Sequence, residues 1–159
     1  MKATRTWLLC LLLTLPAIAD DFKSFGRDSR ATIERSHAGK PLVLVFWSVD
    51  CAYCGEEINH LSALSKKRGD IGLVLVNTDG PELADQAKFF LNKNFPGIRA
   101  ERWIFSGEDP SRLYFSVDKK WQGELPRAYF YNGTGNVRTI AGKVEPRWLD
   151  TWSQETRAK

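Results

Sequence analysis

Apolar and polar positions alternate along the chain in blocks that predict an α/β fold. Two continuous apolar runs, 41–47 and 71–77, are rich in β-branched residues, which is typical of strands buried on both faces of a sheet. Between them, from Cys51 to about Lys67, apolar residues recur every three or four positions, which predicts a helix with one buried face. Two such strands joined by a helix indicate a parallel unit.

The segment before the first strand predicts a helix over 29–36. Asp28 or Ser29 would cap it, and its inward face would hold Ala31, Ile33 and Phe25. Two further helices are expected from first-turn prolines, at Pro81 and at Pro110.

The C-terminal part predicts antiparallel strands. A short strand is expected over 102–105, and the runs 127–131 and 136–141 flank Asn132-Gly-Thr-Gly135, a strong hairpin signal. A last helix starts at Pro146. The expected architecture is a central mixed sheet of four or five strands with helices on both faces.

The first nineteen residues predict a secretory signal peptide. Lys2 and Arg5 precede an apolar run over 8–15, and small residues at Ala17 and Ala19 suit cleavage by a signal peptidase. The run is shorter than the roughly 20 residues that a membrane span needs. We therefore expect cleavage after Ala19, export to the periplasm and a single domain over 20–159. A retained N-terminal anchor is the alternative.

The net charge and its distribution along the chain do not favour nucleic-acid binding. Loss of Lys2 and Arg5 would lower the formal net charge from +4 to +2. No block of like charge and no basic-aromatic stripe is present, so nucleic-acid binding is not expected. We expect a monomer.

The cysteines carry the candidate chemistry. Cleavage would remove Cys10 and leave only Cys51 and Cys54. A bridge across two residues closes so small a loop that it stabilises little, which favours a redox role. At a strand-to-helix junction the helix dipole stabilises the thiolate of Cys51, the attacking species in disulfide exchange. Cys54, one turn further on and expected to be more buried, can then attack Cys51.

The residues around these cysteines resemble the thioredoxin superfamily. Trp47 and the segment Cys51-Ala-Tyr-Cys54 match its Trp-x-x-x-Cys-x-x-Cys pattern. Glu57 is similar to the glutamate of the periplasmic TlpA/ResA-like reductase branch, and Leu125-Pro126 resembles the cis-proline element. The resemblance covers roughly residues 38–152.

This resemblance implies a thioredoxin-like fold and a protein-disulfide reductase. The Cys51/Cys54 dithiol would work through a mixed disulfide, and Glu57 would tune the thiol pKa values and accept a proton. The residues expected to bind or support a partner are Trp47, Tyr53, Leu125 and Pro126. The expected partners are disulfide-containing periplasmic proteins and a membrane thiol electron donor. No nicotinamide or flavin motif is present, so no cofactor is expected.

Three positions depart from the family pattern. Val45 replaces a buried acid, Asp50 replaces the aromatic before the first cysteine, and Asn59 replaces a proline. Asp50 either caps the helix, which we favour, or raises the pKa of Cys51. Trp121, just before the proline loop, is expected in the core rather than in a partner groove.

Other interpretations of the same residues stay open. Glu57 is alternatively a solvated helix acid beside Glu56. The centre could serve a disulfide oxidase or isomerase, or a copper-delivery protein, since two cysteines can bind a soft metal. No histidine follows His60, so we expect no metal site. A redox-inactive binding module would be expected to lack one cysteine or the proline.

Overall fold

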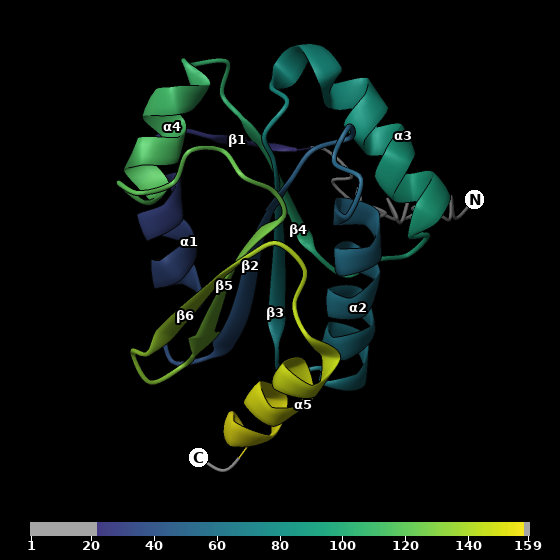
Figure 1. The fold of residues 1–159 in the computed structure, drawn as a ribbon, viewed down its shortest axis with the longest axis vertical. Helices are drawn as coiled ribbons and strands as arrows, with labels where there is room; N and C mark the ends of the chain where they lie inside the picture. The colour runs from purple at the N-terminus through teal and green to yellow at the C-terminus, as the bar shows by residue number, and fades with distance from the viewer. Residues whose placement is uncertain (1–21, 158–159) are drawn as a thin grey trace, which may run out of the picture.

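A six-stranded mixed sheet forms the centre of the structure, a computed structural model that describes residues 22–157 (Figure 1). The strands are β1 (Lys23–Phe25), β2 (Pro41–Trp47), β3 (Gly72–Asn77), β4 (Glu101–Phe105), β5 (Arg127–Asn132) and β6 (Val137–Ala141). The helices are α1 (Ser29–Ser36), α2 (Cys54–Lys67), α3 (Ala84–Asn94), α4 (Pro110–Val117) and α5 (Pro146–Glu155), and a 3-10 turn, η1 (Pro81–Leu83), precedes α3. Residues 1–19, for which the sequence predicts a signal peptide, lie outside the described residues.

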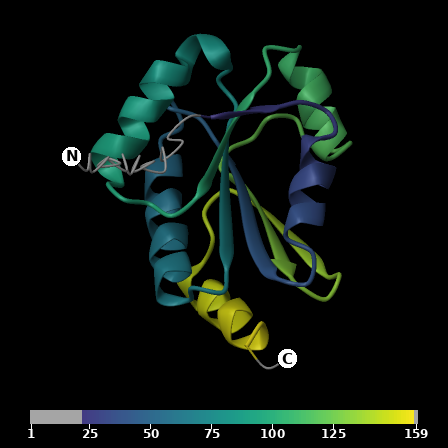
Figure 2. The ribbon, with the colours of Figure 1, turned by 180° about the vertical axis from the view of Figure 1, so that it is seen from behind.

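The strand order is β1-β4-β3-β2-β5-β6, with β1 to β4 parallel and β5 and β6 antiparallel. Side chains alternate along β2, so its two faces contribute to two cores. One core joins the sheet to α2, α3 and α5, and the other joins it to α1 and α4, as Figures 1 and 2 show from opposite sides. The predicted mixed sheet with helices on both faces is confirmed.

The predicted number of four or five strands is wrong, because β1 adds a sixth. Only Phe25 of its three residues is buried, so the segment has no apolar alternation to reveal it. The strand forms because it pairs with β4 and because the Phe25 ring packs against Phe46 and Phe105. Phe25 is therefore a strand residue, and Ala31, expected on the inward face of the first helix, is exposed.

The register of the sheet places three loops at one edge. Trp47, the last residue of β2, pairs with Asn77, the last residue of β3. Antiparallel β5 starts at the same level, since its Arg127 pairs with Phe46. The turn after β2, the turn after β3 and the loop before β5 therefore meet at the carboxyl end of β2. None of the helices in residues 22–157 is long and apolar enough to cross a membrane.

Gly133, in the turn between β5 and β6, has a positive φ of 79°. A Cβ there would lie 3.0 Å from the carbonyl carbon of Lys40, which is backbone and cannot move aside easily. Gly135 also has a positive φ, 97°, but a Cβ there would meet nothing within 4 Å.

We expect Gly133→Ala to destabilise the protein by about 2 kcal/mol or more, because backbone strain of about 1–3 kcal/mol is joined by a steric clash. Gly135→Ala, the matched control, should cost less because it adds only the strain. Urea unfolding of both variants measures the difference. Equal losses of stability would show that the contact with Lys40 is irrelevant.

Candidate active site

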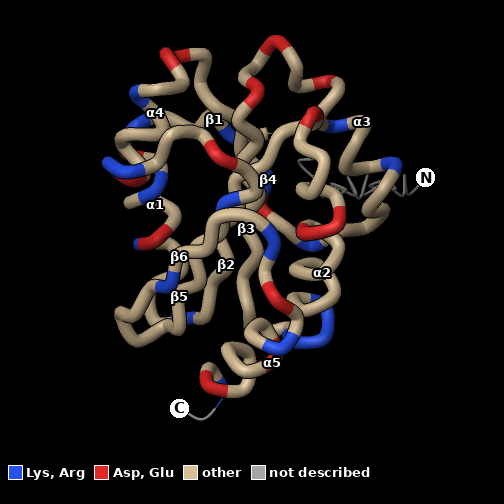
Figure 3. The backbone as a smooth tube through the Cα atoms, in the orientation of Figure 1, with Lys and Arg blue, Asp and Glu red and all other residues tan. Residues whose placement is uncertain are grey.

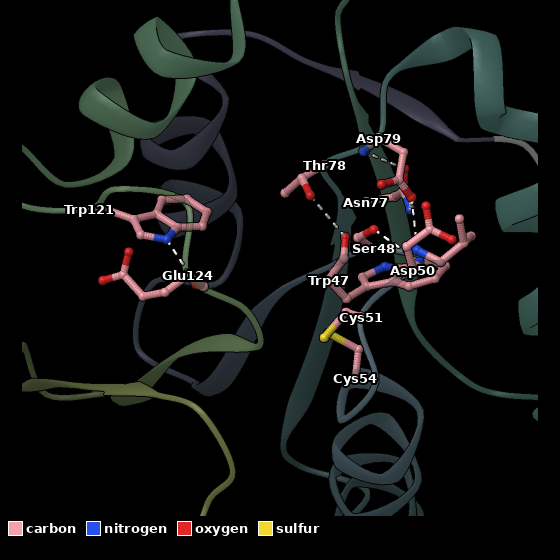
Figure 4. The surroundings of a disulfide bond; sticks show 11 residues. Trp47, Ser48, Asp50, Cys51, Cys54, Asn77, Thr78, Asp79, Trp121 and Glu124 are labelled. Atoms are coloured by element: carbon pink, nitrogen blue, oxygen red, sulfur yellow. Dashed lines mark hydrogen bonds between the residues drawn. A yellow bond between two sulfur atoms is a disulfide. The ribbon is translucent and has the colours of Figure 1, made fainter.

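Cys51 and Cys54 form a disulfide where β2 leads into α2 (Figure 4). Cys54 is fully buried on the apolar side of α2, whereas Cys51 is partly exposed. The helix starts at Cys54 and not at Cys51 as expected, because residues 51–53 form a turn in which the Cys54 N–H donates to the Cys51 carbonyl oxygen at 3.2 Å. The Cys51 sulfur, bonded to Cys54, still lies at the N-terminal end of the helix.

Asp50 does not cap α2. The N-cap residue is Tyr53, and no side chain accepts a hydrogen bond there. The favoured interpretation of Asp50 is therefore wrong, because the helix begins one turn later than the sequence suggested. Asp50 is exposed, and its backbone N–H donates to the Ser48 hydroxyl at 3.2 Å.

The turn that carries Cys51 is held from the end of β3. The Asp79 carboxylate accepts hydrogen bonds from the Val49 N–H at 2.9 Å and the Asn77 side-chain amide at 2.8 Å. The Thr78 N–H donates to the Trp47 carbonyl oxygen at 2.9 Å, and the Thr78 hydroxyl donates to the same oxygen at 3.3 Å (Figure 4). Sequence reasoning missed Asp79. A polar group directly after a buried strand, at the edge where β2 also ends, was the available signal.

Glu57 is buried, with 1% of its surface exposed, so its interpretation as a solvated acid is wrong. Its Oε2 accepts the Val144 N–H at 3.1 Å, while Oε1 has no hydrogen-bond partner among the described residues. Burial raises the pKa of the Glu57 carboxyl above its usual range, although the Val144 hydrogen bond opposes this. Glu56, its neighbour, is the exposed acid and forms an ion pair with Lys143 at 2.8 Å. The hydrogen bond from Lys143 lowers the pKa of Glu56.

The Leu125–Pro126 peptide bond is cis, as the family resemblance predicts. Pro126 stands at the level of Trp47, and its carbonyl oxygen accepts the Gly142 N–H at 2.7 Å. Leu125 is partly buried and packs against both cores. The cis-proline loop therefore lies at the same edge of the sheet as the disulfide.

Arg127, which the sequence analysis did not single out, holds this loop from inside the protein. It is 7% exposed and donates to the Tyr129 hydroxyl at 2.8 Å. Its other guanidinium nitrogens bind the carboxylates of Glu124 at 3.2 Å and Asp118 at 2.5 Å. A single basic residue at the start of an apolar strand gives no pattern that would reveal such a network.

The aromatic residues expected near a partner differ in exposure. Tyr53 is 58% exposed, and the Lys143 ammonium lies 5.7 Å from its ring centroid. Trp47 is fully buried and stacks on Phe90, so it supports the turn and cannot touch a partner. Trp121 is in the core, as expected, and its indole N–H donates to the Glu124 carbonyl oxygen at 3.0 Å. Within residues 22–157, no group of three His, Cys, Asp or Glu side chains could hold a metal ion.

The family comparison agrees with this geometry. Residues 17–140 match the model of the AhpC/TSA family. The chain belongs to the AhpC/TSA family. This membership and the structural likenesses below confirm the expected place in the thioredoxin superfamily, and they agree with the TlpA/ResA-like branch. No match was found among the curated proteins.

Several solved structures share the fold. One is a secreted Mycobacterium tuberculosis disulfide oxidoreductase homologous to E. coli DsbE, with 21% identity, a TM-score of 0.58, and coverage of 76% of this chain and 85% of that chain. A DsbF homologue from Corynebacterium diphtheriae has 17% identity, a TM-score of 0.61 and coverage of 77% and 75%. A thioredoxin-related protein from Neisseria meningitidis serogroup B has 22% identity, a TM-score of 0.59 and coverage of 79% and 90%.

Asp79→Ala should lower the free energy of unfolding by about 1–3 kcal/mol, because it leaves the Val49 N–H and the Asn77 amide without their acceptor. Asp79→Asn retains one acceptor oxygen and should lower the free energy of unfolding less than Asp79→Ala does. Urea unfolding measures both. If the two variants equal the wild type, Asp79 does not hold the turn.

The raised pKa of Glu57 predicts how the free energy of unfolding changes with pH. Because the folded state raises its pKa, the folded chain binds this proton more tightly than the unfolded chain does. Its contribution to stability is therefore fully present below the ordinary pKa of about 4.3 and is lost as the pH rises through the higher folded value. The free energy of unfolding of the wild type, relative to Glu57→Gln, should fall over that window.

Glu56→Gln is the matched control, because the carboxyl of Glu56, next to Glu57 in the sequence, has a lowered pKa. Relative to that variant, the wild type should gain stability as the pH rises and lose it as the pH falls through the lowered value. Urea unfolding at several pH values measures both differences. A Glu57 difference that is independent of pH would contradict the assigned burial.

Proposed function

We propose that this protein is a periplasmic thiol–disulfide oxidoreductase that reduces disulfides of client proteins. The observation that carries the proposal is the pairing of a partly exposed Cys51 with a fully buried Cys54 at the start of α2, beside the cis-proline loop. AhpC/TSA membership and the thioredoxin-like fold support a thiol–disulfide redox role. The predicted signal peptide supports the compartment.

The reduced enzyme would begin with the Cys51 thiolate, which the helix N-terminus stabilises. Its sulfur attacks one sulfur of the client disulfide, the client S–S bond breaks, and the leaving thiolate takes a proton. The Cys54 thiol then loses its proton and its sulfur attacks Cys51 in the mixed disulfide. This step forms the Cys51–Cys54 disulfide and releases the client with both cysteines reduced.

Two electrons pass to the client in each cycle, so an external dithiol must reduce the Cys51–Cys54 disulfide again. A membrane thiol protein is the proposed donor. Glu57 is the proposed proton acceptor for Cys54, because it lies three residues further along the same buried face of α2. Its carboxyl has a raised pKa and one oxygen without a partner among the described residues, which suits a group that gains and loses a proton.

Purified protein should catalyse the reduction of insulin by dithiothreitol. Cys51→Ser should abolish this activity, because the attacking sulfur is lost. Cys54→Ala should also stop turnover but should accumulate a mixed disulfide with the client, visible by non-reducing electrophoresis and mass spectrometry. The two variants control for each other, since only one retains the attacking sulfur.

Turnover by Cys51→Ser would contradict the assignment of the attacking cysteine. A protein that reduces no disulfide and holds one metal ion tightly per chain would contradict the proposed function as a whole.

A further inference from the structure

We propose that a groove beside the disulfide receives a client segment with a basic residue close to its cysteine and an apolar side chain further along. This inference rests on the proposed function and specifies its substrates. The groove, called here the α3 groove, lies between the turn before Cys51 and helix α3. Its lining includes Val49, Asp50, Asp85, Phe89, Phe90 and Lys93.

The α3 groove lies next to the turn that carries Cys51, although Cys51 itself is not among its lining residues. Asp50 directly precedes Cys51, and Val49 and Asp50 form one wall. In Figure 4, Trp121 and Glu124 lie on one side of the disulfide and Asp50 on the other. An extended client chain bound at Cys51 advances about 3.3 Å per residue. If the chain runs along the turn that carries Val49 and Asp50, residues a few positions from its cysteine meet α3.

An exposed aromatic ring supplies the apolar contact. Phe89 is 66% exposed, more than any other large apolar side chain in residues 22–157. Its neighbour Phe90 instead packs on Trp47, with ring centroids 5.4 Å apart. A single exposed apolar side chain is ordinary on a protein surface. This one lines a groove whose wall includes Asp50, the residue before the reactive cysteine, so a client side chain could bury it during the reaction.

The charged residues of the groove favour a basic residue in the client segment. Asp85, Phe89 and Lys93 are spaced by four residues and so share one face of α3. Figure 3 shows the acidic residues at the start of α3 and basic ones after them. Asp50 adds a second carboxylate, and no ion pair within residues 22–157 involves Asp50 or Asp85. Lys93 lies 5.4 Å from the Phe89 ring and disfavours a second basic residue at that end.

Two peptides that form mixed disulfides with 2-mercaptoethanol test this specificity. One carries lysine beside its cysteine and leucine a few residues away, and the other has glutamate and serine at those positions. Stopped-flow measurement of their reduction by the reduced protein should show the first reacting about three- to tenfold faster at low salt. High salt should reduce the part of the preference that is due to charge.

Two variants separate the contribution of charge to the peptide preference from that of apolar contact. Asp85→Asn should weaken the preference for lysine, and Phe89→Ser should weaken the preference for leucine. Phe115→Ser is the matched control, because Phe115 is 58% exposed on α4 and does not line the groove. Hydroxyethyl disulfide, a small neutral substrate, should be reduced equally by all of these proteins, which shows that the Cys51 chemistry is unchanged.

The outcomes distinguish failure of the α3 groove proposal from failure of the proposed reductase function. Equal rates for the two peptides, or equal effects of Phe89→Ser and Phe115→Ser, would overturn the α3 groove while leaving the reductase intact. Failure to reduce hydroxyethyl disulfide and both peptides would overturn the proposed function and the groove together. Concentration-dependent dimerisation that Phe89→Ser abolishes would assign the groove to a second copy of the chain and overturn the proposal.

Discussion

The structure depends on the burial of β2 between two strands and two helical layers. β2 pairs with β3 on one side and β5 on the other, and six of its seven residues are buried. Its backbone N–H and C=O groups must bond to these neighbours, because water does not reach them. The register that results sets where β2 ends. It thereby brings three segments to one edge of the sheet: the turn that carries Cys51, the turn that contains Asp79, and the loop that ends at Pro126.

Two buried ionisable groups near this edge, Arg127 and Glu57, differ in how well their charge is compensated by hydrogen-bond partners. A buried charge costs free energy unless it is paired and hydrogen-bonded. Arg127 has carboxylate and hydroxyl partners, so its charge is compensated and it can hold the proline loop. Glu57 has a single backbone donor and a raised pKa. The charge of a Glu57 carboxylate is therefore less compensated than that of Arg127.

Much of the fold could be predicted because its main elements have strong local patterns. The apolar run of β2 and the three-to-four spacing along α2 identified the parallel unit, and the turn at 132–135 identified the hairpin. β1 could not be predicted, because three residues with one buried side chain form a strand only when β4 offers an edge to pair with. The start of α2 was misplaced by one turn, because apolar spacing does not locate a helix cap.

The sequence by itself determined the Cys51–Cys54 pair, Glu57 as a candidate and Pro126 as the loop element, because these follow from spacing within one strand–helix junction and from family resemblance. Only the tertiary structure decided which neighbours matter. Asp79 binds a residue 30 positions away, and Glu57 binds one 87 positions away. Burial depends on such distant segments. Trp47 therefore became a support and Glu57 a buried acid only once the helices had packed against the sheet.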